Sequence, residues 1–300
     1  MIARQEEENL KIATWNVRGL TESKRNPEPK TYNVLKILKR YGIDIVILTE
    51  TKIGGDSFEE EYNIDGIKYN IYYSGAREEH RNHHGVALVV RKDLWRSLSG
   101  EWESISNRLV SARFAKGNEE AWIVGAYAPT NVSDEAVKGE FYDQLHNTLR
   151  KVPDTAMLVL LGDFNANINP HEECSSSQVV GPYGCSRRPT SDNGLRLLEL
   201  CSCFSLVLTN TLHKVKTRDI MTYKDKCSSG EWRLVDYVAV RRRHLSRFYK
   251  TRALRGARQL YPQADHHLVR STINLWEPQH LETRHQRKQK ASNGTCHSRL

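Results

Sequence analysis

The 300-residue chain carries 45 Lys and Arg against 36 Asp and Glu, which gives a formal net charge of +9. A hydrophobic content of 38% is enough to build a globular core and excludes a broadly disordered chain. The basic balance favours a polyanionic partner, such as nucleic acid or a phosphorylated substrate.

The cysteine pattern and the termini exclude several classes of protein. The six cysteines form no CxxC pair and no paired knuckle spacing, which argues against a structural zinc site. The N-terminus, MIARQEEENLK, lacks the apolar segment of a secretory signal. No apolar run approaches the roughly 18 residues that a membrane span needs. We therefore expect a reduced, soluble, intracellular protein that is neither secreted nor bound to a membrane.

Short apolar runs rich in Val and Ile recur along the chain, and most are too short for helices. Between some of them, apolar residues recur at helical spacing, and Gly42 ends the first such stripe. In chain order, we predict strands and helical stripes at 11–15 (strand), Val34, Leu35, Leu38 and Tyr41 (helix), 44–49, 85–90 and 121–127 (strands), Phe141, Leu145 and Leu149 (helix), 157–161 (strand), Leu197, Leu198 and Cys201 (helix), and 206–209, 235–240 and 267–275 (strands).

The number of strands relative to helices predicts an α/β domain in which packed sheets are covered by helices. The strand pattern continues without a linker, so we predict one domain over residues 10–277. Residues 1–9 are predicted to form a frayed tail. The polar and basic residues 278–300 are predicted to form a disordered one.

Positive charge is concentrated in the stretch RRRHLSRFYKTRALRGAR (241–258), which holds eight Lys or Arg and no acid. Such a block is suited to a phosphate backbone, but a solvated loop beside a strand explains it equally well.

Polar residues of chemically useful types lie where the predicted strands begin or end. Singly, each has a simple structural explanation, because Asp and Asn form turns, Glu is common on surfaces, and Tyr and His often pack in cores. Together they are harder to explain without an active site, since α/β sheets carry their chemistry at strand ends. The set comprises Asn16, Glu50, Tyr127, Asp163, Asn165, Asp236, Asp265 and His266.

These residue types form a coherent chemical set. Glu50 and Asp265 are hard oxygen donors of the kind that Mg²⁺ prefers, and Asn16 can add a carbonyl oxygen. Because no Cys/His ligand set is present, zinc is disfavoured. A histidine held by a carboxylate is a general base or a phosphate contact near neutral pH, so Asp236 is the candidate to orient His266.

Six stretches occur in the order TWNVRGL, LTETK, GAYAPT, GDFNA, VDYVAV and ADHHLV. Between Lys11 and Trp276 they resemble the endonuclease/exonuclease/phosphatase superfamily, the fold of pancreatic deoxyribonuclease and of AP endonucleases. The stretch VVGPYGCSRRPTSDNGLRLLELC, followed by LVLTNT and VDYVAVRRRH, resembles the endonuclease domain of RTE-type non-LTR retrotransposons and the related craniofacial development protein 2-like sequences. No reverse transcriptase follows, so we expect a domesticated or orphaned copy or a truncated gene model.

The resemblance implies a four-layer α/β sandwich of two packed, mostly antiparallel sheets with outer helices. It also implies a function for each matched residue. Glu50 becomes the main Mg²⁺ ligand, with Asn16 and Asp265; Mn²⁺ is the alternative cation. Asp163 and Asn165 position or deprotonate water, Tyr127 contacts the phosphate or leaving group, and His266 with Asp236 acts as acid or base. Whether Asp163 or His266 is the base is left open.

The sequence departs from the AP-endonuclease pattern at two positions. Arg18 stands where those enzymes carry an Asp two residues after the Asn, which removes a metal ligand and adds a cation near the phosphate. This favours simple nicking over abasic-site repair. Ala264 replaces the Ser of the usual SDH motif. We expect Arg18 to contact nucleic acid, together with three consecutive arginines of the basic block, Arg241, Arg242 and Arg243.

Three functions remain open on the sequence. The first is a monomeric, Mg²⁺-dependent DNA-nicking endonuclease in the nucleus, or also in the cytoplasm. The second is a phosphatase acting on a small-molecule or lipid phosphoester, against which the basic block argues. The third is an inactive remnant that binds nucleic acid or protein.

Overall fold

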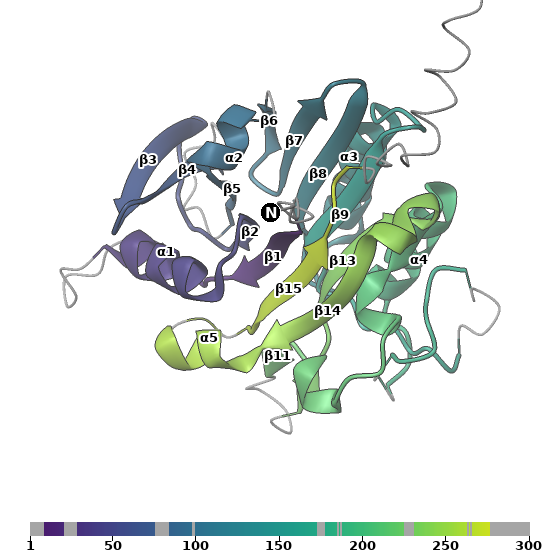
Figure 1. The fold of residues 1–300 in the computed structure, drawn as a ribbon. Coiled ribbons are helices and arrows are strands. Elements are labelled where there is room, and N and C mark those ends of the chain that lie inside the picture. Colours follow the sequence, from purple (N-terminus) through teal and green to yellow (C-terminus); the bar gives the residue numbers. More distant parts are fainter. Residues whose placement is uncertain are drawn as a thin grey trace, which may run out of the picture.

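The computed structural model describes residues 9–20, 29–75, 84–97, 100–172, 178–184, 186, 188–224, 231–262, 264 and 266–276. Two large sheets pack face to face, and helices lie on their outer faces (Figure 1). The predicted four-layer sandwich is therefore confirmed. The predicted tails, except Asn9, lie outside the described residues, as does Asp265.

The first sheet has seven strands, of which only β1 and β2 run parallel to each other. In sheet order they are β14 (Phe248–Leu254), β15 (Leu268–Ile273), β1 (Leu10–Asn16), β2 (Ile45–Thr49), β5 (Val86–Arg91), β4 (Ile67–Ser74) and β3 (Phe58–Ile64).

The second sheet has six strands, of which only β8 and β9 run parallel to each other. In sheet order they are β10 (Leu206–Leu208), β13 (Asp236–Arg241), β9 (Met157–Asp163), β8 (Glu119–Tyr127), β7 (Leu109–Lys116) and β6 (Glu101–Ser106). A small separate ribbon joins β11 (Tyr223–Lys224) to β12 (Trp232–Arg233).

The central strands are buried on both faces, which explains their continuous apolar runs. In β2, Ile45 and Ile47 point into the layer between the two sheets. Val46 and Leu48 point the other way, into the layer beneath helix α1 (Lys30–Tyr41). Since successive strand residues alternate between faces, one short segment supplies two cores.

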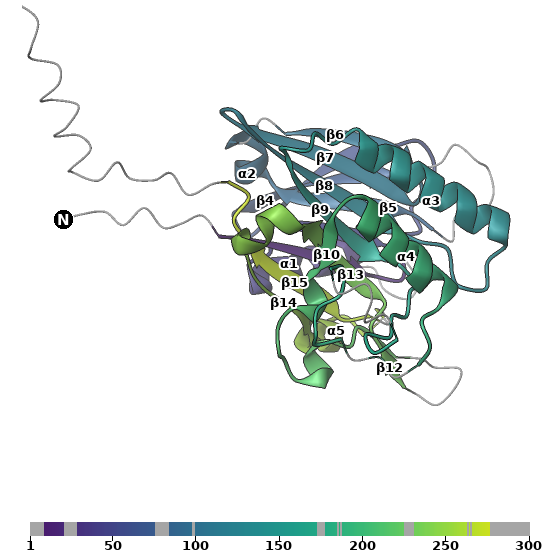
Figure 2. The same ribbon diagram turned by 90° about the vertical axis from the view of Figure 1, so that its right-hand side faces the viewer.

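The helices cover the two outer faces. Helix α1 packs on the seven-stranded sheet and ends at Gly42, whose left-handed backbone (φ 60°) lets its N–H reach the carbonyls of Leu38 and Lys39. Helices α3 (Glu135–Arg150) and α4 (Asp192–Cys203) cover the six-stranded sheet (Figure 2). Shorter helical segments are α2 (Lys92–Ser97), α5 (Arg255–Leu260), η2 (Thr209–Thr211), η3 (Thr217–Asp219) and η4 (Arg242–Arg247).

All the predicted strands and helical stripes are present, but the structure adds strands that the sequence patterns did not predict. Two of these, β3 and β6, are edge strands with largely exposed or half-buried side chains, as in FEEEYNI. An edge strand buries only a small part of its side-chain surface, so its sequence need not show an apolar pattern. No helix in the described part of the chain is long and apolar enough to cross a membrane.

The topology brings six strand ends to one edge of the sandwich. The last residues of β8 and β9, Tyr127 and Asp163, are register partners, and Asp163 also pairs with Asp236, the first residue of β13. In the other sheet, Asn16 ends β1 beside the end of β2, while β15 begins at that same end.

Candidate active site

Asn16 joins the two sheets at this edge. Its side-chain N–H₂ group donates to Glu50 Oε1 over 2.8 Å and to Asp163 Oδ2 over 2.9 Å. Glu50 directly follows β2, whereas Asp163 ends β9 in the opposite sheet. The structure therefore brings together three residues that are up to 147 positions apart in the chain.

His266 and Asp236 form a buried pair next to this bridge. The Nδ1 atom of His266 lies 2.7 Å from Asp236 Oδ2, and its Nε2 atom lies 3.8 Å from Asp163 Oδ2. Burial alone lowers the pKa of His266, but the negative charges of Asp236 and Asp163 outweigh it and raise this pKa to about 9. This raised pKa favours an imidazolium that donates from Nδ1 to Asp236.

The pKa of Asp163 is also raised, which for a carboxyl group favours the neutral form. Its burial and the nearby charge of Asp236 raise its pKa well above the ordinary carboxyl range. Hydrogen bonds from Asn16 and from the backbone N–H of Asn165 offset part of this effect. A carboxylate tuned upward in this way is a better proton acceptor near neutral pH than a solvated Asp.

Tyr127 faces Glu50 as a hydrogen-bond donor, with its hydroxyl 3.2 Å from Oε1. Burial and the charges of Glu50 and Asp163 raise its pKa, so the phenol stays neutral. Arg108, which the sequence analysis missed, lies with its guanidinium 5.2 Å from the Tyr127 ring centroid and donates to the Tyr127 carbonyl oxygen.

The GDFNA turn holds Asn165 in a left-handed conformation (φ 46°). Its backbone N–H donates to Asp163 Oδ1 over 3.0 Å, and its side-chain nitrogen donates to the Ala128 carbonyl over 2.9 Å. Among the described residues, nothing donates to the Asn165 side-chain oxygen, so this atom is open to water. Gly162 is needed just before Asp163, because a Cβ there would lie 1.8 Å from the Ala126 carbonyl oxygen.

Three other residues at this edge adopt left-handed backbone conformations, although none is glycine: Arg18 (φ 53°), Glu50 (φ 52°) and Lys52 (φ 56°). Such backbones are unfavourable for L-residues and concentrate at functional sites. Lys52 Nζ lies 3.8 Å from Glu50 Oε2, so a cation already faces this carboxylate.

The donor set fits a hard cation best at Glu50. Asp163, Asp236 and His266 have ligand atoms within 4.8 Å of one another, but all three are buried and Asp236 is bonded to the imidazole. Mg²⁺ retains several waters, so it requires an accessible oxygen such as those of the Glu50 side chain, which is 24% exposed. The Asn16 side-chain oxygen instead accepts from the Arg18 N–H, so its role as a metal ligand stays a prediction.

The structure separates the predicted arginines from this edge. Arg241 is buried at the opposite end of β13, where its guanidinium donates to the carbonyls of Val152, Pro153 and Ala156. This burial argues against the predicted contact between Arg241 and nucleic acid, because protein groups enclose the guanidinium. Arg242 and Arg243 are exposed but follow it at the same far end. Five strand steps put them about 17 Å or more from Asp236.

Asn193 is a supporting residue that the sequence analysis did not single out. Its fully buried side chain donates to the carbonyls of Pro129 and Asn165, over 2.8 and 3.4 Å. It thereby ties the turn after β8 to the turn after β9. The available signal was the polar TSDNG stretch at the start of a helix, where Asn193 would otherwise be expected to face solvent.

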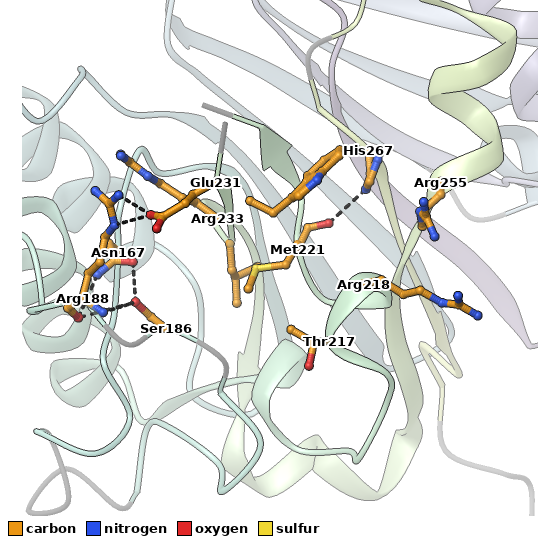
Figure 3. Close-up of a pocket in the computed structure, with 12 residues that line it drawn as sticks. Asn167, Ser186, Arg188, Thr217, Arg218, Met221, Glu231, Arg233, Arg255 and His267 are labelled. Atoms are coloured by element: carbon orange, nitrogen blue, oxygen red, sulfur yellow. Dashed lines mark hydrogen bonds and ion pairs between the residues drawn. The ribbon is translucent and has the colours of Figure 1, made fainter. Parts of the chain in front are cut away.

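A cavity of about 500 Å³ is lined by His267, the residue that follows His266 (Figure 3). Among the residues that line it, Arg188 forms an ion pair with Glu231, and the Ser186 hydroxyl donates a hydrogen bond to Asn167 Oδ1. The lining residues are Asn167, Ser186, Arg188, Thr217, Arg218, Met221, Glu231, Trp232, Arg233, Leu234, Arg255 and His267.

Comparison with known families agrees with this geometry. The model of the endonuclease/exonuclease/phosphatase family matches residues 13–286. The chain belongs to the endonuclease/exonuclease/phosphatase family. Membership places it among nuclease- and phosphatase-type hydrolases. Craniofacial development protein 2 of Bos taurus, a relative, is 30% identical over 247 residues, which cover 82% of this chain and 38% of that protein. The chain thus spans well under half the length of this relative.

Several solved structures of other proteins share the fold. AP endonuclease LMAP from Leishmania major aligns with a TM-score of 0.64 at 14% identity, over 89% of this chain and 88% of that one. The endonuclease domain of TRAS1, a telomere-specific non-LTR retrotransposon, aligns with a TM-score of 0.57 at 12% identity, over 89% of this chain and 99% of that one. The 3′ phosphatase NExo from Neisseria, bound to product DNA hairpin, aligns with a TM-score of 0.61 at 17% identity, over 89% of this chain and 100% of that one.

Proposed function

We propose that the protein is a divalent-metal-dependent phosphodiesterase, and specifically a Mg²⁺-dependent endonuclease that nicks one strand of DNA. The observation that carries this proposal is the Asn16 bridge, which fixes Glu50 and Asp163 beside the buried His266–Asp236 pair. This arrangement provides an accessible carboxylate, a proton acceptor and a cation within one cluster. Hydrolysis of a phosphodiester needs all three.

Glu50 is the proposed metal ligand, and Asp265 is proposed to assist it on the strength of the family resemblance alone. When bound, Mg²⁺ supplies Lewis acidity and offsets negative charge on the phosphate. Mn²⁺ is the proposed substitute cation.

The residues of the chain divide the remaining tasks. Asp163 is the proposed base, because its raised pKa suits proton transfer from water near neutral pH. The open side-chain oxygen of Asn165 orients that water. The His266 imidazolium, held by Asp236, faces the phosphate and stabilises its charge. Tyr127 remains protonated, so it donates a hydrogen bond to the phosphate or the leaving group.

Substrate and origin are part of the same proposal. The net charge of +9 and the likeness to a solved structure that contains bound DNA support DNA as the substrate. The likeness to the endonuclease domain of a retrotransposon supports an origin of this chain from a retrotransposon. Arg18, in place of the expected acid, favours nicking over abasic-site repair. A DNA substrate implies residence in the nucleus, and we propose that the protein acts as a monomer.

Nicking of supercoiled plasmid tests the proposal. We expect conversion to the open-circular form with Mg²⁺, none with EDTA, and loss of activity in His266→Ala. His146→Ala is the matched control, because His146 lies on helix α3 and packs against Phe204 on the outer layer. Equal nicking by His266→Ala and wild type would refute the assignment of the site.

A phosphatase acting on a small phosphoester is the second candidate, and the 500 Å³ cavity beside His267 is the observation that favours it. Such an enzyme would release phosphate from soluble phosphoesters and leave plasmid intact. DNA binding without any cleavage, in Mg²⁺ and in Mn²⁺, would instead identify an inactive remnant.

A further inference from the structure

The basic block does not lie in one place, because strand β14 carries it from one end of the sandwich to the other. Arg242 and Arg243 lie at the end remote from the candidate site. In β14, Phe248 pairs with Ile273, and Leu254 pairs with Leu268, just after His266 and His267. Helix α5, which follows β14, therefore lies at the catalytic end of the sheet, and it carries Arg255 and Arg258.

Arg255 has an unbalanced charge. Its side chain is exposed and makes no hydrogen bond or ion pair with the described residues. It lines the 500 Å³ cavity and also an adjacent cavity of about 270 Å³, so it stands where the two meet. Figure 3 shows Arg255 and Arg218 on the side of the larger cavity away from the Arg188–Glu231 pair.

The charged groups that line the larger cavity are mostly positive, and one of them, Arg218, lies 4.0 Å from Asp219 Oδ1. Four arginines face a single carboxylate, Glu231, which is already bonded to Arg188. The four are Arg188, Arg218, Arg233 and Arg255. An excess of cations around a concave surface creates a local field that attracts anions, beyond the effect of each charge alone.

Trp232 lines both cavities and makes two ring contacts. It stacks on His267, with ring centroids 4.5 Å apart, and the Arg258 guanidinium lies 5.4 Å from the indole centroid. Arg258 is held in place by a hydrogen bond to the Ala264 carbonyl. These two contacts hold the Trp232 ring in place beside Arg255 and Arg258.

We propose that Arg255, backed by Arg258 on the Trp232–His267 stack, forms a subsite for a backbone phosphate of the polynucleotide strand that flanks the cleaved bond. The inference rests on the proposed function, since it assumes a polynucleotide substrate. It identifies the catalytic-end part of the basic block, rather than Arg242 and Arg243, as the part that contacts DNA. A phosphate contact carries no base information, so this subsite tightens binding equally for all sequences.

The experiment compares two matched variants of the full chain, Arg255→Gln and Arg242→Gln. Each removes one exposed charge whose side chain has no partner among the described residues, and the two come from opposite ends of the same block. Binding of a fluorescein-labelled duplex oligonucleotide is measured by anisotropy in EDTA, at several salt concentrations and with two unrelated sequences. Plasmid nicking with Mg²⁺ is measured in parallel.

We expect Arg255→Gln to bind both sequences about threefold or more weakly at low salt, with a salt slope that is smaller by about 0.9, as for one lost phosphate contact. Nicking should show a higher KM and an unchanged kcat, while Arg242→Gln matches wild type. Charge reversal, Arg255→Glu against Arg242→Glu, should enlarge the difference.

The outcomes separate the two proposals. Wild type that binds DNA and loses affinity only in Arg255→Gln supports the subsite, even if no nicking is seen and the proposed activity fails. Wild type that nicks, with both variants unchanged or with Arg242→Gln the weaker binder, overturns the subsite and leaves the activity standing. Wild type that does not bind DNA overturns the subsite. So does altered turnover of a small phosphoester by Arg255→Gln with DNA binding unchanged.

Discussion

Replacing Asp236 by Asn tests how the His266 cation is maintained. Asp236 is fully buried, and one of its oxygens lies 2.7 Å from His266 Nδ1. Its other oxygen is enclosed and accepts no hydrogen bond from the described residues. The substitution keeps the shape of the side chain, but it removes the largest influence that raises the pKa of His266.

The size of the effect follows from that pKa. It lies at about 9 against an ordinary value of 6.5, a difference worth about 3 kcal/mol in favour of the imidazolium. Asp163 and Glu50 remain in Asp236→Asn and retain part of this stabilisation. We therefore expect the pKa of His266 to fall and the nicking rate at pH 8 to drop about tenfold or more, because each unit by which this pKa lies below the assay pH lowers the imidazolium fraction about tenfold.

The assay combines a titration of His266 by NMR with time courses of plasmid nicking. Asp44→Asn is the matched control, because Asp44 is also a buried carboxylate, but it bonds Arg91 and the Lys11 N–H at the other end of β1 and β2. This control should lose stability and keep its nicking rate per folded molecule. A folded Asp236→Asn protein that nicks within about threefold of wild type would refute the reasoning.

Three further outcomes follow from the site. Glu50→Gln should weaken Mn²⁺ binding about tenfold or more by calorimetry, because it removes the accessible carboxylate; unchanged affinity would place the metal elsewhere. Asp163→Asn should raise the melting temperature in EDTA at pH 8. The pKa of Asp163 is higher in the folded than in the unfolded chain, so its contribution to stability is present at low pH and is lost as pH rises. A difference in melting temperature between variant and wild type that persists at low pH would contradict this. Gly162→Ala should destabilise the fold by several kcal/mol in urea unfolding, because its Cβ would overlap the Ala126 carbonyl; a loss below about 1 kcal/mol would show that β8 and β9 separate easily.

The periodicity of the sequence was sufficient for the buried parts of the fold. Strands such as β2 and β9 are enclosed on both faces, so their apolar runs are unambiguous. The strand β3, with the sequence FEEEYNI, gave no such signal because its side chains are mostly exposed. The polar residues at strand ends could also be identified from their position in the chain, and their types already suggested phosphodiester chemistry.

Only the tertiary structure decided which of these residues act together. Sequence spacing cannot show that Asn16 donates to both Glu50 and Asp163, because the bridge depends on two sheets packing face to face. The basic block shows the same limit. Its eight cations lie within one short stretch of sequence, residues 241–258. Because a strand rises about 3.3 Å per residue, β14 places the two ends of this stretch at opposite ends of the sheet. The sequence alone determined that this chain carries a basic block, and the register of β14 against β15 determined that Arg255, rather than Arg241, lies at the end of the sheet where His267 lies.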